Sequence, residues 1–116
     1  MTSNEFIELI TKNIIRKRRE GKKWMKPESI YPEYADDYNF EDYDLFNIIC
    51  YEMEKKGIVK IDTRREYKHE YQREEAIASD SPPMIKKIRF VEGSEELVAK
   101  AYLKAKNENM KNKKEK

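Results

Sequence analysis

The stretch from Asn39 to Ile61, NFEDYDLFNIICYEMEKKGIVKI, constrains the fold of this chain most. Its apolar residues recur every three or four positions, which is typical of a helix with one buried side. We expect Asn39 to cap this helix and Gly57 to end it in a left-handed conformation. A strand then opens at Ile58. The buried stripe is predicted to comprise Tyr43, Leu45, Phe46, Ile49, Cys50 and Met53.

The composition leaves room for one small domain. The chain has 116 residues, of which 41% are charged and 38% are apolar, so the core must be concentrated in a few stripes. No apolar run approaches the roughly 18 residues of a membrane span, and no signal-peptide pattern opens the chain. The single cysteine excludes an internal disulfide framework and a multi-cysteine zinc site. We therefore expect a cytoplasmic protein without a membrane partner.

Two helical segments are predicted before the central helix. Residues 4–19 read as a first helix, because Ile7, Ile10 and Ile14 fall on one face, and Gly21 ends it. Residues 22–27 form a basic loop that holds the only tryptophan. Ser29 is expected to cap a short helix that runs through Tyr34.

The chain after the central helix is predicted to form two strands and a last helix. The strands cover residues 58–65 and 84–91, and a polar loop with an optional helical turn at 71–78 joins them. Ser94 caps the last helix, and its buried stripe is expected to comprise Leu97, Val98, Ala101, Tyr102 and Ala105. A basic, disordered tail is predicted at residues 107–116.

This order of elements describes an α+β fold of the winged-helix class. Three helices precede a two-stranded antiparallel ribbon, the wing, and a C-terminal helix follows it. The winged-helix domain would occupy residues 1–106.

Charge is strongly segregated along the chain, although the net charge is only +2. From Lys12 to Lys26 there are eight basic residues and one acidic residue, whereas Pro27 to Glu54 holds nine acidic residues and no basic one. Such asymmetry favours distinct surfaces with distinct partners. The alternative interpretation is a set of solvated faces that serve solubility.

Two basic surfaces are candidates for binding nucleic acid, and double-stranded DNA is the expected partner. The first runs along the first helix into its loop and comprises Lys12, Arg16, Arg19, Lys22, Lys23, Trp24 and Lys26. The second is the wing, with Arg64, Arg65, Lys68, Arg73, Lys86, Lys87 and Arg89. Arginine can fork onto a phosphate, and tryptophan can stack on a base or a sugar.

The outward face of the central helix favours a different role. Four or five carboxylates near this face would repel phosphates, so we do not expect the helix to read bases as it does in many winged helices. A protein-interaction or dimerisation surface is the alternative function, and it would use Asp44, Asn47, Ile48 and Tyr51.

No catalytic residue, cofactor or metal site is predicted. The acidic segment at 33–44 fails the EF-hand pattern, because Asp42 stands where that calcium loop needs a central glycine. Cys50 lies inside the apolar stripe and the only histidine, His69, lies in the polar loop, so they are not paired as nucleophile and base. We therefore expect a protein that is not an enzyme by itself.

Several short runs resemble the N-terminal winged-helix region of JetD-like proteins, the nuclease subunits of Wadjet plasmid-defence systems. The resemblance covers roughly residues 6–105 and rests on Pro32-Glu33-Tyr34, Phe46, Gly57-Ile58, Ile85-Lys86-Lys87-Ile88, Glu95-Glu96-Leu97 and Ala101-Tyr102. It implies a DNA-associated arm that joins a Toprim-type nuclease domain. The chain lacks the constellation of Glu and Asp-x-Asp on a glycine-containing sheet that forms a Toprim site, so the resemblance transfers no catalytic residue. The chain is expected to be either a fragment of such a subunit or a free-standing accessory module.

Overall fold

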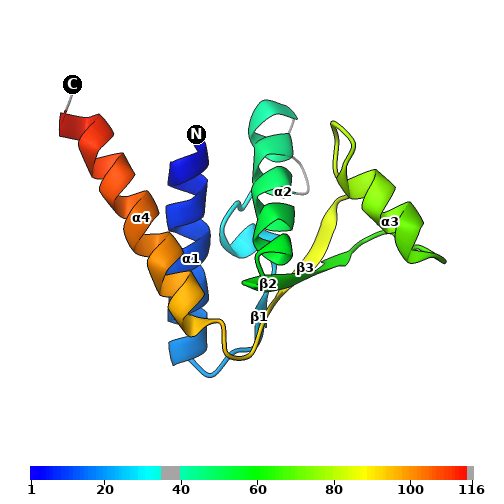
Figure 1. The fold of residues 1–116 in the computed structure, drawn as a ribbon, viewed down its shortest axis with the longest axis horizontal. Helices are drawn as coiled ribbons and strands as arrows, with labels where there is room; N and C mark the ends of the chain where they lie inside the picture. The colour runs from blue at the N-terminus through cyan, green and yellow to red at the C-terminus, as the bar shows by residue number, and fades with distance from the viewer. Residues whose placement is uncertain (35–39, 115–116) are drawn as a thin grey trace.

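The computed structural model describes residues 1–34 and 40–114 (Figure 1). Within these residues the chain forms four α-helices and a three-stranded antiparallel sheet. The elements in chain order are α1 Ser3–Arg19, β1 Trp24–Met25, the 3-10 helix η1 Pro27–Ser29, α2 Phe40–Lys55, β2 Val59–Thr63, α3 Glu70–Ile77, β3 Ile85–Phe90 and α4 Glu95–Lys114. No helix in the described ranges is long and apolar enough to cross a bilayer.

Helices α1 and α4 lie side by side and antiparallel, although they are at opposite ends of the chain (Figure 1). At one end, Arg18 of α1 lies 3.5 Å from the carboxylate of Glu95. At the other end, the Asn109 side chain donates a hydrogen bond of 3.1 Å to the backbone oxygen of Asn4. Helix α3 lies within the β2–β3 connection (Figure 1).

The core forms where α1, α2 and the sheet meet, and the predicted stripes supply most of it. Phe6, Ile10 and Ile14 of α1 are buried, as are Phe46, Ile49, Cys50 and Met53 of α2. The rings of Phe6 and Phe46 meet edge-on at 5.7 Å between centroids. The sequence prediction of these two buried faces is therefore confirmed.

The end of α2 is also as predicted. Gly57 has φ of +78°, a conformation that costs other residues about 1–2 kcal/mol. Its N–H donates to the oxygen of Glu54 at 3.1 Å, and the N–H of Ile58 donates to the oxygen of Met53 at 3.0 Å. This pair of bonds is the Schellman motif, and it turns the chain directly into β2. The expected cap at Asn39 lies outside the described residues.

Two predictions for the segment after α1 are wrong. The basic loop contains the two-residue strand β1, which pairs with β3, so the sheet has three strands in the order β1-β3-β2 and not two. The short helix spans Pro27–Ser29 and does not begin at Ser29, because proline suits the first turn of a helix, where its missing N–H is not needed. A strand of two residues is too short to show an alternation in the sequence.

The last helix also differs from its prediction. It continues to Lys114, whereas disorder was expected from residue 107. Val98 and Ala105 are buried as predicted, but Leu97 is 46% exposed. The extension follows from the packing of α4 along the whole of α1, which no local apolar pattern after residue 106 indicates. The optional helical turn in the β2–β3 connection is present as α3.

Candidate nucleic-acid interface

Trp24 is presented on the outer face of the sheet. In β1 the side chains alternate, and Met25 is buried in the core, so its neighbour Trp24 faces the other way. The Trp24 side chain is 45% exposed, although tryptophan has a large apolar area to bury. The Nζ of Lys87 lies 5.3 Å from the centre of its ring, which is a cation–π contact.

Basic side chains surround Trp24 on the same face. Arg89 is the register partner of Trp24 on one side and of Lys60 on the other. Alternation about the buried Ile88 and Ile61 places Lys60, Lys87 and Arg89 on the outer face with the tryptophan. We call the set Trp24, Lys60, Asp62, Lys87 and Arg89 the outer sheet face.

Asp62 organises the cations of this face. Its carboxylate lies 2.9 Å from Arg89 and 3.8 Å from Lys87. The four ionisable side chains of the face are three cations and one carboxylate, which leaves a formal charge of +2. Partly exposed ion pairs of this kind contribute about 0–1 kcal/mol each to stability. The face therefore keeps an excess of positive charge held in a defined arrangement.

Three lysines of the predicted first patch flank β1. Lys22, Lys23 and Lys26 are all exposed. The N–H of Phe90 donates to the backbone oxygen of Lys23 at 2.9 Å, so this lysine is anchored beside the sheet. These lysines are neighbours of Trp24 in the chain, and β1 is an edge strand, so they lie beside the edge of the sheet.

The remaining wing residues have mixed environments. Arg64 lies 3.7 Å from the carboxylate of Glu28, and Arg65 lies 5.5 Å from the ring centre of Tyr67. Lys86 and Lys68 are exposed. Binding of nucleic acid by these residues stays a prediction.

Lys12, Arg16 and Arg19 of the predicted first patch are exposed, but they do not lie on the outer sheet face. They line a groove between α1 and α4 together with apolar side chains. Their neighbour Arg18 serves the fold: its guanidinium donates to the backbone oxygen of Val91 and, at 3.0 Å, to the hydroxyl of Ser94. The basic run of α1 is therefore divided between two environments.

Part of the predicted protein-interaction surface on α2 is buried. Asn47 is 0% exposed and accepts a hydrogen bond of 2.6 Å from the Tyr34 hydroxyl. Tyr51 is 2% exposed and donates to the backbone oxygen of Pro83 at 2.8 Å. The expectation that both residues face outward is wrong, because Tyr34 packs over Asn47 and the β2–β3 connection folds over Tyr51. Ile48 remains 37% exposed, and Asp44 accepts from the Ser81 hydroxyl at 3.3 Å.

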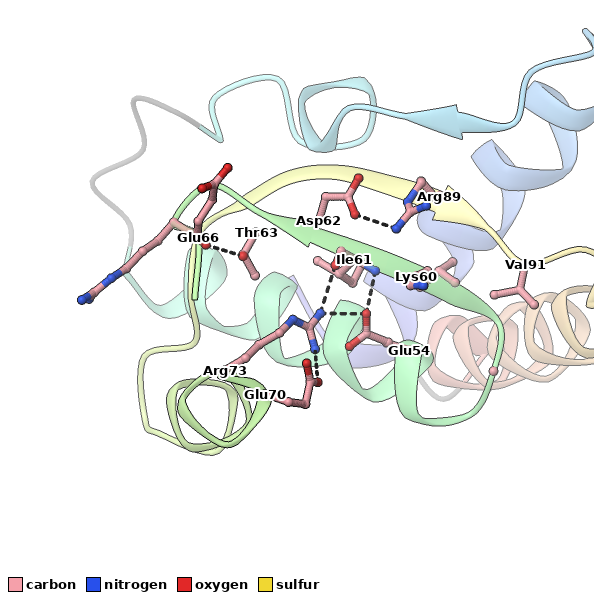
Figure 2. A pocket seen from close by; sticks show the side chains of 13 residues that line it. Glu54, Lys60, Ile61, Asp62, Thr63, Glu66, Glu70, Arg73, Arg89 and Val91 are labelled. Carbon is pink, nitrogen blue, oxygen red and sulfur yellow. Dashed lines mark hydrogen bonds and ion pairs between the residues drawn. The ribbon is translucent and has the colours of Figure 1, made fainter. Parts of the chain in front are cut away.

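Arg73, a predicted wing cation, belongs to a network at the free edge of β2 (Figure 2). One of its nitrogens lies 2.9 Å from the carboxylate of Glu54 and donates to the backbone oxygen of Ile61 at 2.9 Å. The same Glu54 oxygen accepts from the N–H of Ile61 at 2.7 Å. The two side chains thereby satisfy backbone groups that an edge strand leaves unpaired.

A pocket of about 600 Å³ surrounds this network (Figure 2). Its lining holds four cationic and four acidic side chains, so it has no formal excess of charge. Arg73 also lies 3.9 Å from Glu70, and Arg89 pairs with Asp62. Because most of its charges are paired with one another, the pocket by itself is a poor site for an anion. It shares Lys60, Asp62 and Arg89 with the outer sheet face.

Lys60 was not among the predicted site residues, although the alternation in Val59-Lys60-Ile61-Asp62 would have indicated its outward direction.

Burial prevents Cys50 from acting as a nucleophile. Its thiol is enclosed in the core, and burial raises the pKa of that thiol well above its ordinary value. In residues 1–34 and 40–114, no group of three or more His, Cys, Asp or Glu side chains is placed to hold a metal ion.

Comparison of the chain with protein-family models, with curated proteins and with solved structures gave no match.

Proposed function

We propose that this protein is a non-enzymatic winged-helix module that binds double-stranded DNA, mainly through the phosphate backbone and with low sequence specificity. The observation that carries the proposal is the exposed Trp24 on the outer sheet face, in contact with Lys87 and beside Arg89. The order of α1, η1 and α2 before the β2–β3 hairpin supports the winged-helix assignment.

The chemistry of the outer sheet face suits a polyanion. Cations near phosphates release condensed counterions, and this release is the main source of non-specific affinity for DNA. An exposed aromatic ring beside them adds a surface for stacking on a base or a sugar. Asp62 holds Lys87 and Arg89 in place before DNA arrives, which lowers the entropic cost of ordering their long side chains.

Helix α2 is an unsuitable reader of bases in this fold. The α3 helix and the β2–β3 connection lie over part of its outward side, and Tyr51 is buried beneath them. Its exposed or half-exposed acids, Glu41, Asp44 and Glu52, would repel the phosphates that line a groove. We therefore assign DNA contact to the sheet and to the lysines beside β1, and this assignment implies little direct readout of sequence.

The resemblance to JetD-like proteins supplies a biological context for the proposal. In that context the module is the DNA-associated arm of a cytoplasmic plasmid- or phage-defence nuclease complex, and catalysis belongs to another domain.

The experiment is a titration of a labelled duplex of random sequence, followed by fluorescence anisotropy. If three phosphates are contacted, affinity should fall about 40-fold between about 50 and 200 mM salt. Lys87→Glu and Trp24→Ala should each weaken binding. Lys100→Glu, the same charge change on an exposed residue of α4, should have little effect. Salt-independent binding, or no binding at low salt, would refute the proposal.

A further inference from the structure

Helices α1 and α4 enclose a groove of about 710 Å³ that the proposed DNA contact does not use. Its apolar lining includes Leu9 and Ile15 from α1 and Tyr102 and Leu103 from α4. Leu103 is 56% exposed, and the other three side chains are partly exposed. Apolar side chains that line a groove and are bounded by polar residues offer a surface on which another molecule can pack.

The edge of this groove is basic. Lys12, Arg16 and Arg19 follow one another at spacings of four and three residues, so α1 presents one cation on each successive turn. The rise from the first to the last is about 10 Å. None of the nine residues that line the groove is acidic, and each of them lies in the described part of the chain.

Arg16, the middle of these three cations, is held in place at the groove by a hydrogen bond. Arg16 donates to the side-chain oxygen of Asn13, and the Asn13 amide donates in turn to the backbone oxygen of Leu9 at 2.8 Å. On the opposite side, the Nζ of Lys106 lies 5.7 Å from the ring centre of Tyr102. Neither of these contacts neutralises a positive charge, so the charges at the groove remain available to a ligand.

We propose that this groove binds an acidic amphipathic helix from a partner protein. Apolar side chains of that helix would pack on Leu9, Ile15 and Leu103. Carboxylates on successive turns would pair with the cations of α1, whose spacing matches one acidic residue every three or four positions. The groove runs between two antiparallel helices, so a third helix can seat its ridge of side chains there.

The apolar part of the groove argues against DNA as the occupant. A phosphate backbone gains nothing from Leu9, Ile15 and Leu103, whereas burying them against apolar side chains removes apolar surface from water and is favourable. The groove lies on α1 and α4 and the outer sheet face on the strands. The protein could therefore hold a DNA duplex and a protein partner on separate surfaces.

The test uses the full chain and a panel of synthetic helical peptides of about 14 residues, long enough to span the groove. Each peptide carries leucines along one face and glutamates every three or four positions beside them. A matched panel has lysine in place of each glutamate. We expect the acidic panel to bind in the micromolar range by titration calorimetry and the basic panel to bind at least about tenfold more weakly.

Two variants locate the site. Arg16→Glu should weaken peptide binding at least about tenfold through charge repulsion. Leu103→Ala should weaken it through lost apolar contact, and because Leu103 is exposed this change should leave the fold intact. Lys100→Glu is the control with the same charge reversal outside the groove lining. Amide chemical shifts should move at Lys12, Asn13 and Ala99 on addition of an acidic peptide.

Three outcomes would overturn the proposal. In the first, no acidic peptide binds, or the basic panel binds equally well. In the second, Leu103→Ala abolishes a dimer seen by sedimentation, which would make a second copy of the chain the occupant. In the third, Arg16→Glu weakens DNA binding as strongly as Lys87→Glu does. The DNA titration is independent of the peptide titration, so failure of the groove and failure of the outer sheet face are distinguishable.

Discussion

Glu54 and Arg73 lie 19 residues apart in the chain, yet together they satisfy both backbone groups of Ile61 at the free edge of β2. Glu54 comes from α2 and Arg73 from α3, so the pair joins three elements. An unpaired strand edge invites aggregation through added strands, and these two side chains cover part of this one. The same contact holds α3 beside α2 and so helps to cover the outward side of α2.

Replacing Arg73 tests how much its contacts with Glu54 and Ile61 stabilise the fold. We expect Arg73→Ala to lower the free energy of unfolding by about 1–3 kcal/mol, because the partly buried Glu54 carboxylate and the Ile61 oxygen lose a partner. Urea unfolding measures the loss, and hydrogen exchange should accelerate at the α3 amides. Arg65→Ala is the control, since Arg65 is exposed and its side chain lies against the Tyr67 ring. Equal stabilities for the two variants would contradict the prediction.

The hydroxyl of Tyr34 should contribute to the free energy of unfolding in addition to the packing of its ring. Its hydroxyl donates to Asn47 at 2.6 Å and accepts from the N–H of Ile85 at 2.7 Å, all in the buried interior. Tyr34→Phe leaves both partners unsatisfied, so we expect a loss of about 1–3 kcal/mol in urea unfolding. Tyr71→Phe removes a hydroxyl from a residue that is 58% exposed and should change stability by less than about 0.5 kcal/mol.

Stability should fall at alkaline pH. Burial raises the pKa of the Cys50 thiol and of the Tyr34 and Tyr51 hydroxyls above their ordinary values of 9.0 and 10.0. Below about pH 9 both the folded and the unfolded chain keep these protons, so stability is fully present. As pH rises, the unfolded chain ionises while the folded chain does not, and stability is lost by up to about 1.4 kcal/mol per pH unit for each group.

Denaturant unfolding over a pH series measures this loss. Cys50→Ala should move the onset from near pH 9 toward pH 10, because only tyrosines then remain. A stability that stays constant up to pH 11 would contradict the burial of all three groups.

Trp24 should report DNA binding directly, since it is the only tryptophan. We expect its fluorescence to be quenched when a duplex is added and to recover when salt is raised, because phosphate contacts weaken with salt. Lys87→Gln should reduce the quenching without changing the folded spectrum. An unaltered emission at saturating DNA would place the contact on another face.

Substitution of Asn109 tests whether the last turns of α4 contribute to the stability of the fold. Asn109→Ala removes the hydrogen bond to Asn4, and we expect a loss of about 1 kcal/mol, whereas a disordered tail would give none. Lys111→Ala, an exposed change two residues later, is the matched control.

The sequence by itself determined the elements that have a local pattern. The apolar stripes of α1 and α2 and the stop at Gly57 were predictable, because helix periodicity and a left-handed turn depend on residues a few positions apart. The outward direction of Trp24, Lys87 and Arg89 as one surface was not, since it requires the two residues of β1 to pair with β3, more than 60 positions away.

Only the tertiary structure decided which polar residues are free to bind. Asn47 and Tyr51 read as an outward face of a helix, but long-range hydrogen bonds to Tyr34 and Pro83 take them into the interior. Arg73 reads as a cation of the wing, yet it completes an edge strand. The basic run of α1 reads as one patch, yet α4 converts part of it into one side of a groove. Burial and pairing of a side chain depend on what packs against it, and the order of residues along one segment does not contain that information.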